Sequence, residues 1–519
     1  MRKLRVLPLL LAVSMAGQAQ ATDLLSIARD ALIYNADLSA SRAGFESTRA
    51  GEDIQRGDLL PQVSASGALT RNHSISQESS AGDGVSGPGD DHYNSTSVEL
   101  QATQALFDAT NWYELEAAKR ESAQEALYLN AEREHLLYSV AEAYMEVLRA
   151  REQLDTLRAE ERAVARQLEQ VRQQFDVGIV AATDVYEARA TYDLTRAQRI
   201  AQESTLRVNF EALEELTGKQ YASIMGLADD LPIEVPAPAD PRAWVEMAST
   251  QNHEVLAARA GVELARANLD VSRSGHLPTL SAFANYSYSD SDHDYRRGHG
   301  EESRMGIEAN IPIYRGGSTS AQVRQGTHSL EQTQYQQMSV LRGAIQQVRS
   351  FYAQTVNNVL TVQAQRRAIE SSRSALEATR NGYEAGTRTI VDVLDAQQSL
   401  YSAIYNYADA RYNYVLNMLN LRRQAGVLDM ATLEVVNDWL REERAVSLNI
   451  GEQDRLGMEL GDNASAPGMQ GDSPLARPGE GAGARELPSP NQPPTPRSGA
   501  GGMAPMNPVG SGPADELGS

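Results

Sequence analysis

The sequence predicts a mixed, mainly α-helical fold in which four strands continue into long antiparallel coiled-coil helices. Two observations support this prediction: an internal repeat, and a strand pair followed by a helical hairpin in each copy. Gly178 and Gly386 are 208 positions apart, and the same offset relates Asp184 to Asp392. A fixed offset between matching residues indicates tandem copies of one structural unit. Two copies therefore account for most of the chain.

The composition excludes several classes of protein. The chain has 519 residues but only 6% aromatic residues, which is a small supply for a large globular core. It contains no cysteine, so disulfides, thiolate metal sites and a lipid-modified N-terminal cysteine are excluded. The formal net charge of −22 argues against nucleic acid as a partner, because the phosphate backbone is also negative.

Composition and pattern divide the chain into six segments. The first combines a basic start, a short apolar stretch and an Ala-x-Ala exit, which is the pattern of a signal peptide. The last is rich in Gly, Pro and Ser and buries too little apolar surface to offset its ordering entropy. The expected segments are a signal peptide (1–21), a first structural repeat (22–218), a linker (219–241), a second structural repeat (242–428), a short helical belt segment (429–450) and a disordered tail (451–519).

Each repeat is expected to open with one continuous helix, over 24–57 in the first and 243–275 in the second. Apolar and alanine residues recur at helical spacing in both stretches. Pro61 and Pro278 then end these helices, because proline removes a backbone donor and clashes with the preceding turn. Beyond each proline, apolar and polar residues alternate as they do in a strand.

Polar stretches at 73–95 and 289–303 predict loops, and alternating return strands follow near 98–106 and 307–313. The expected strand length of about 9 to 11 residues crosses an outer-membrane bilayer when the strand is tilted. Four strands cannot close a barrel, which needs about eight, and an open edge in lipid leaves backbone groups unsatisfied. Closure therefore requires several copies of the chain: a trimer supplies twelve strands, and a dimer only a narrow eight.

Very long helices are predicted over 111–175 and 318–383, and returning helices over 184–217 and 390–425. Their apolar residues follow alternating spacings of three and four, which is the pattern of a coiled-coil seam. At about 1.5 Å per residue, the longer helices measure on the order of 100 Å. Each repeat thus ends in an antiparallel helical hairpin.

The two hairpin tips, 175–185 and 383–395, contain more polar groups than a simple turn needs. Asp392 and Asp395 are three residues apart near a helix start, so they share one face of that helix. Thr389 and Asp392 also fit a capping box, in which the acid has a purely structural role. In a symmetric oligomer, however, acids that face a pore form rings that bind cations. The two roles are compatible, and both stay open.

The two tips and three further motifs carry a resemblance to a known family. The motifs are Phe175-Asp-Val-Gly178-Ile-Val-Ala-Ala-Thr183-Asp184-Val185, Gly386-Thr-Arg388-Thr-Ile-Val-Asp392-Val-Leu-Asp395-Ala, Gly275-His-Leu-Pro278-Thr-Leu, Leu59-Leu-Pro61-Gln and Ala410-Arg-Tyr-Asn-Tyr414. Over residues 22–436 the chain resembles the TolC family of trimeric outer-membrane efflux and type I secretion channels of Gram-negative bacteria. The resemblance implies a shared trimeric 12-stranded β-barrel that continues into a periplasmic helical barrel and is shut at its tip at rest.

The resemblance also implies roles for the polar residues of the tips. It implies a gate latch of Thr183, Asp184, Tyr383 and Arg388, in which Asp184 accepts hydrogen bonds from Tyr383 and Arg388. It places both aspartates of the second tip at the narrow entrance, as cation-binding rings. The residue types alone fit a plainer interpretation, with a helix-end aromatic, a solvated arginine and an N-cap pair.

For the whole molecule, the resemblance implies an outer-membrane exit duct for multidrug efflux, type I protein secretion or both. The implied partners are a homotrimer, outer-membrane lipid, a periplasmic adaptor (membrane fusion) protein and an inner-membrane RND-type or ABC-type transporter, whose docking opens the tip. The alternative is a periplasmic coiled-coil adaptor or structural spacer, which needs neither strands of bilayer length nor tandem repeats. The cargo is not specified, because the pump selects it before it reaches the duct.

No enzymatic chemistry, cofactor or structural metal is expected. The sequence has no Walker motif and no nucleophile elbow. The stretch Gly82-Asp-Gly84-Val-Ser-Gly87 matches the dinucleotide-binding pattern, but Pro88 follows it where that motif needs a helix. An acidic loop lacks the regular spacing of a metal site, so a solvated loop is the preferred interpretation of Asp290, Asp292, His293 and Asp294.

Overall fold

The computed structural model describes residues 21–76, 89–292 and 298–447. The chain separates into two units, residues 1–452 and 453–519, and the fold below is that of the first. Most of the predicted signal peptide, the glycine-rich stretch 82–87, His293 with Asp294, and the predicted disordered tail lie outside the described residues.

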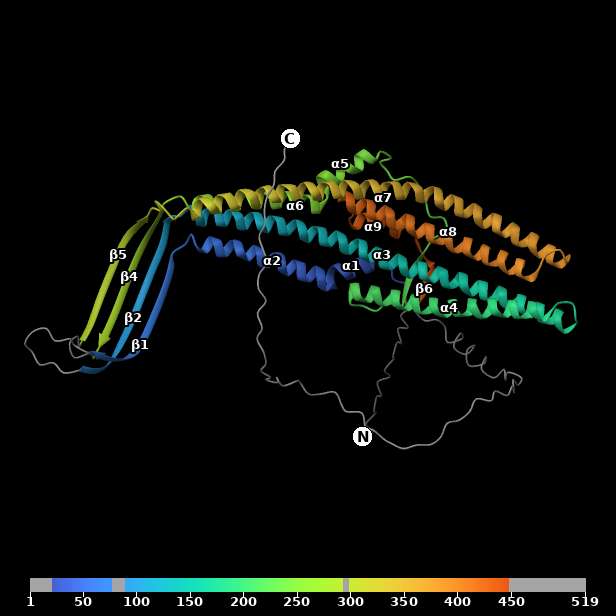
Figure 1. The fold of residues 1–519 in the computed structure, drawn as a ribbon, viewed down its shortest axis with the longest axis horizontal. Coiled ribbons are helices and arrows are strands. Elements are labelled where there is room, and N and C mark those ends of the chain that lie inside the picture. Colours follow the sequence, from blue (N-terminus) through green and yellow to red (C-terminus); the bar gives the residue numbers. More distant parts are fainter. Residues whose placement is uncertain (1–20, 77–88, 293–297, 448–519) are drawn as a thin grey trace, which may run out of the picture. The chain divides into compact units, whose positions relative to one another are not determined.

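Four antiparallel strands form one sheet at one end of the long helices (Figure 1). The strands are β1 (Gln62–Ser76), β2 (Gly89–Phe107), β4 (Thr279–Ser291) and β5 (Gly298–Asn310), and they lie in the order β1-β2-β4-β5. The prediction of four strands is confirmed. Their lengths of 13 to 19 residues exceed the predicted ones, because the hydrogen-bond ladder continues through polar residues that the sequence assigned to loops.

The strand register separates an apolar face of the sheet from a polar one. Leu100 lies opposite Ala65 on one neighbouring strand and opposite Tyr286 on the other, so all three side chains share a face. The apolar face carries Val63, Ala65, Leu69, Val98, Leu100, Ala102, Ala282, Ala284, Tyr286, Met305 and Ile307. The opposite face carries Ser64, Ser66, Glu99, Gln101, Asn285, Glu302, Arg304 and Glu308. A sheet with these two faces is suited to separate an apolar medium from an aqueous one.

The predicted opening helix of each repeat is wrong as a single element. The first is two helices, α1 (Leu24–Tyr34) and α2 (Ala36–Gly57), and the second is also two, α5 (Pro241–Gln251) and α6 (His253–Ser274). The breaks fall at Asn35 and Asn252, whose backbones are extended. Each asparagine caps the second helix of its pair with its side-chain oxygen.

The same two asparagines also form matching long-range hydrogen bonds. The side-chain amide of Asn35 donates to the carbonyl of Leu216 at 3.1 Å, and that of Asn252 donates to the carbonyl of Gln424 at 2.9 Å. Each acceptor lies at the end of the returning helix of the same repeat. Because both asparagines are buried, these bonds satisfy groups that water cannot reach. The two structural repeats therefore share the helix break as well as the helices.

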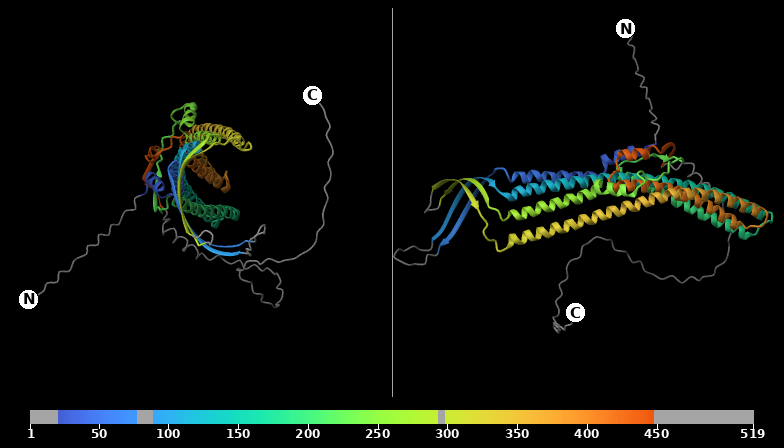
Figure 2. Two further views of the ribbon diagram at one scale, coloured as in Figure 1. Left: turned by 90° about the vertical axis from the view of Figure 1, so that its left-hand side faces the viewer. Right: turned by 90° about the horizontal axis from the view of Figure 1, so that it is seen from above.

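Four long helices form two antiparallel hairpins that lie side by side (Figures 1 and 2). They are α3 (Ala109–Asp176) with α4 (Ala182–Thr217), and α7 (Ser318–Glu384) with α8 (Ile390–Ala425). Predicted and observed boundaries agree within about two residues, which is the usual uncertainty of helix ends. Among the described residues, no helix is both long enough and apolar enough to cross a membrane.

Glycines with left-handed backbones end α3 and α7. Gly178 has φ of 76° and Gly386 has φ of 73°, and nothing lies within 4 Å of a Cβ built on either residue. In the second turn the amide of Thr387 donates to the carbonyl of Gly382 at 2.8 Å, which satisfies one of the last carbonyls of the helix. The turns therefore need glycine for its backbone freedom and not for space.

A belt of short elements surrounds the middle of the hairpins. The linker contains β3 (Ser223–Leu227), which pairs with β6 (Leu440–Ser447), and α9 (Met430–Asn437) precedes β6. The predicted helical belt segment is thus helical only in its first half. Its second half is a strand because β3 supplies a pairing edge far away in the sequence.

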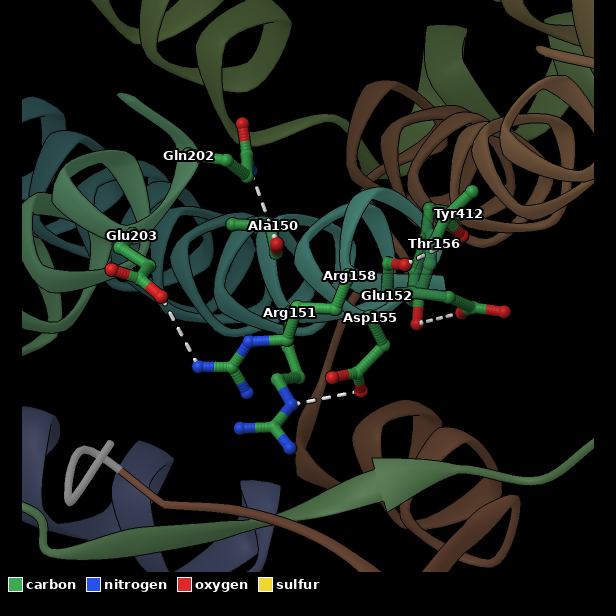
Figure 3. Close-up of polar contacts among 9 residues, drawn as sticks. All are labelled: Ala150, Arg151, Glu152, Asp155, Thr156, Arg158, Gln202, Glu203 and Tyr412. Atoms are coloured by element: carbon green, nitrogen blue, oxygen red, sulfur yellow. Dashed lines mark hydrogen bonds and ion pairs between the residues drawn. The ribbon is translucent and has the colours of Figure 1, made fainter. Parts of the chain in front are cut away.

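Buried polar contacts fix α4 and α8 against α3 at the level of the belt (Figure 3). The amide of Gln202 donates to the carbonyl of Ala150 at 3.0 Å, and Arg158 pairs with the buried Glu203 at 3.2 Å. On the other side of α3, the hydroxyl of Tyr412 donates to the carboxylate of Glu152 at 2.7 Å. Because directional bonds tolerate little sliding, they fix the register of the helices.

A matched pair of glycine substitutions tests the account of the turns. Gly386→Ala should destabilise the protein by about 1 kcal/mol, because an L-residue is strained in the left-handed region. Gly343→Ala should stabilise it by about 0.5 to 1 kcal/mol, because Gly343 lies inside α7, is exposed and has nothing within 4 Å of its Cβ position. Thermal unfolding followed by circular dichroism measures both changes, and shifts of the same sign would contradict this account.

Candidate functional site

The two hairpin tips lie at the end of the helices that is opposite to the sheet (Figure 1). A small apolar cluster beneath them joins the hairpins and draws on all four long helices. Its buried members are Val164, Leu168, Val171, Ala188, Leu376, Ile390, Val393 and Leu394. The cluster holds residues from two repeats next to each other, so the tips form one polar site.

Asp392 is held by the capping box that the sequence predicts at the start of α8. Its Oδ2 accepts hydrogen bonds from the backbone amide and the hydroxyl of Thr389, both at 2.8 Å, and its own amide donates to that hydroxyl at 3.3 Å. These bonds, with a smaller contribution from the charge of Arg388, lower the pKa of the Asp392 carboxyl below its ordinary value. The capped aspartate therefore stays ionised under acidic conditions that protonate a free aspartate.

Arg388 and Asp395 flank this capped aspartate. The guanidinium of Arg388 lies 3.9 Å from Oδ1 of Asp392, and both side chains are in contact with solvent. Asp395 is exposed and lies one turn further along α8, on the same face as Asp392. The second tip thus presents two carboxylates to solvent.

Asp184 occupies the position of Asp392 in the first repeat but has a different environment. The N-cap of α4 is Ala181, which provides no side-chain cap, so the capping box cannot form there. The hydrogen bond of the Asp184 carboxylate comes from the neighbouring hydroxyl of Thr183, at 3.4 Å. Asp184 therefore keeps most of its capacity to accept hydrogen bonds.

Tyr383 connects the two hairpins through a residue that the sequence did not single out. Its hydroxyl donates to Oε1 of Gln174 at 2.9 Å, which links the end of α7 to the end of α3. Burial raises the pKa of Tyr383, and the negative charge of Asp184 raises it further, so Asp184 is close enough to act electrostatically. The structure thus gives Tyr383 the acceptor Gln174, and it gives Arg388 the neighbour Asp392.

A difference between the two repeats points to Gln174. At the offset of 208 its counterpart is Gly382, and a Cβ at Gly382 would lie only 2.8 Å from Cγ of Arg388. Glycine lets Arg388 fold over the second tip, whereas the first tip carries a long amide at the same position. Comparison of the two repeats in the sequence could therefore have identified Gln174, because its side chain has no counterpart at Gly382.

The sequence matches the family model described as "Outer membrane efflux protein" over residues 27–219 and 244–427. The two matched stretches correspond closely to the two structural repeats and cover most of the chain. The unmatched residues between them contain β3 and the start of α5.

Two relatives of known role resemble the chain over most of its length. It is 32% identical to "Outer membrane protein TolC" of Escherichia coli (strain K12), over 91% of this chain and 95% of the relative. It is 31% identical to "Alkaline protease secretion protein AprF" of Pseudomonas aeruginosa, over 78% of this chain and 85% of the relative.

Solved structures share the fold. The outer membrane protein VceC of Vibrio cholerae superimposes with a TM-score of 0.65 at 18% identity, over 78% of this chain and 96% of that one. CusC superimposes with a TM-score of 0.66 at 20% identity, over 78% of this chain and 92% of that one. At these identities the likeness concerns the fold alone.

The family is one of transport ducts and not of enzymes. The chain is an outer-membrane exit duct of the efflux and secretion type that continues as a periplasmic tunnel, and the alternative of a periplasmic adaptor or spacer is not favoured. The chain belongs to the outer membrane efflux protein family.

Proposed function

We propose that three copies of the chain form one duct whose periplasmic tip is a gate. The observation that carries the proposal is the sheet, in which β1 and β5 each have one neighbour among the described strands. An edge strand in lipid leaves a row of backbone groups without partners, so β5 of one copy pairs with β1 of the next. Three sheets of four strands then close one barrel.

The two faces of the sheet support this arrangement. Closure with the apolar face outward places Leu69, Met305 and Ile307 against lipid, and all three are well exposed in the single chain. The polar face then lines the lumen with serine, glutamine and glutamate side chains. This alternation is the usual pattern of outer-membrane barrels.

At the other end, the polar residues of the tips act as the latch of the gate. The bond from Tyr383 to Gln174 holds α7 against α3 within one protomer. In the first tip, Asp184 has a carboxylate that is free of any bond from the N-cap residue and is bonded by the hydroxyl of Thr183. In the second tip, Arg388 presents an exposed guanidinium. Each exposed contact contributes little, about 1 kcal/mol or less, so a docking partner has only modest bonds to replace. The partner is a periplasmic adaptor together with an inner-membrane pump of the RND or ABC type.

Asp392 and Asp395 form two rings of three carboxylates around the closed tip. Three-fold symmetry repeats each exposed carboxylate, and rings of acids in a narrow aqueous entrance attract multivalent cations. The capping bonds from Thr389 fix the orientation of Asp392, which suits it to line a pore. Capping and cation binding are thus two roles of one side chain.

The trimer is tested by the migration of outer-membrane extracts on denaturing gels. Unheated samples should contain the protein at the mass of a trimer, and heating should convert it to the monomer, because a closed barrel resists detergent until it unfolds. A soluble periplasmic monomer would rule out the proposal.

The latch is tested by single-channel conductance in planar bilayers. Tyr383→Phe combined with Arg388→Ser should raise the conductance, because the loss of about 1 kcal/mol of latch energy shifts the ratio of open to closed channels about fivefold towards the open state. Gln174→Ala should act in the same direction as Tyr383→Phe alone, because it removes the same bond. Tyr335→Phe is the control, since Tyr335 is exposed within α7, away from the tip. Unchanged conductance in the first two variants would remove these residues from the gate.

The rings are tested by cation block of the same channels. Asp392→Asn combined with Asp395→Asn should weaken block by a trivalent cation at least about tenfold, since the carboxylate charge is lost while a capping oxygen remains. Glu377→Gln, which removes an exposed acid from α7 about two turns before its end, should leave the block intact. Block that persists in the double variant would place the cation site elsewhere.

A further inference from the structure

A groove of about 350 Å³ lies between the two hairpins just behind the tip. Its walls are one face of α3 and the last turns of α7, and Val393 of α8 lies at its side. The Tyr383–Gln174 hydrogen bond lies at the end towards the tip. Towards the sheet, the hydroxyl of Tyr401 donates to the carbonyl of Ala159 at 3.2 Å.

Two arginines line the groove from opposite hairpins. Arg166 extends from α3 and Arg380 from α7, and both side chains are exposed. Neither forms an ion pair with any residue in the described part of the chain. Elsewhere on the first hairpin, Arg158 and Arg199 are both paired with Glu203. The groove thus presents two guanidinium groups that have no ion-pair partner of their own among the described residues.

Two buried amide side chains lie next to these arginines. Gln167 lines the groove and is only 8% exposed. Gln397 is 1% exposed, receives a long hydrogen bond of 3.5 Å from Arg380, and its Nε2 has no hydrogen-bond partner.

The electrostatics of Tyr401 show that the arginines act on the same region. Burial raises the pKa of Tyr401, and so does the charge of Glu160, whereas the charges of Arg166, Arg380 and Arg162 lower it. Tyr401 is one turn from Gln397 on α8, so the positive charges surround the seam between the hairpins. Among the residues that line the groove, Glu384 is the acid that opposes the two arginines.

We propose that this groove binds a multivalent oxyanion of the phosphate class, held between Arg166 and Arg380. Guanidinium groups donate paired hydrogen bonds to phosphate oxygens, and two arginines balance the charge of a dianion better than that of a single carboxylate. The bound oxyanion joins α3 to α7, so it ties one hairpin to the other. Its effect on opening rests on the proposed gate, whereas the binding itself does not.

Titration calorimetry with inorganic phosphate on the full-length protein in detergent tests the binding. The unaltered protein should bind phosphate saturably, and Arg166→Gln combined with Arg380→Gln should weaken binding at least about tenfold, because charge-assisted bonds are lost. Arg172→Gln is the matched control, since Arg172 is exposed on α3 but does not line the groove. Glu384→Gln should tighten binding, because it removes the opposing charge.

Absence of saturable phosphate binding in the unaltered protein, or equal binding by the double variant, would overturn the site. Tighter binding of glycerol 3-phosphate than of inorganic phosphate would support it and assign it to phosphate esters, and the reverse order would support it as a site for the free ion. Phosphate should also lower single-channel conductance, and in the double arginine variant it should not. Normal phosphate binding with no change in conductance would overturn the proposed effect of phosphate on opening. Failure of the proposed gate is seen separately, as unchanged conductance of the Tyr383 and Arg388 variants in the absence of phosphate.

Discussion

The rest of the structure depends on the packing of the middle of α3. This helix contacts α2 and α4 of its own repeat and α6 and α8 of the second repeat, so both repeats pack against it. Tyr144, at its centre, is fully buried, and its hydroxyl donates to the carbonyl of Met225 in β3 at 2.7 Å. Burial of its ring provides apolar free energy, and the hydrogen bond satisfies its polar end. A helix of 68 residues is stable because of such tertiary contacts and not by propensity alone.

The two repeats are alike at the helix breaks that hold the hairpins and different at the tips, where we propose the gate. Asn35 and Asn252 break their helices in the same way and bond to equivalent carbonyls. At the tips, by contrast, Asp392 is fixed by a capping box, whereas Asp184 follows an alanine N-cap and keeps free acceptors. Duplicating one unit supplies the scaffold, and small changes at its two turns give a fixed tip and a tip able to make new bonds.

Local signals were sufficient for the elements whose cause is local. The helix at 390–425 was predicted at its observed boundaries, because Thr389 with Asp392 marks its start and Gly426 its end. The breaks at Asn35 and Asn252 were missed, because an asparagine inside an amphipathic stretch does not by itself end a helix, and the carbonyls that accept its amide here are distant in sequence. Strand β6 was missed for the same reason, since its partner β3 is more than 200 residues away. Tyr383 was identified at the tip, but Gln174, which accepts its bond, depends on how two hairpins pack.

Charges of opposite sign lie on two sides of the start of α8, with the aspartates on α8 itself and the arginines on α3 and α7. Asp392 and Asp395 face solvent, and Val393, between them in sequence, lines the groove that holds Arg166 and Arg380. Opposite charges attract, so the cation proposed at the aspartates favours the oxyanion proposed in the groove, and linkage requires that each raises the affinity of the other equally. Under the two proposals, a tip that binds both ions is held shut from its entrance and from within its wall, and removing either ion weakens the binding of the other.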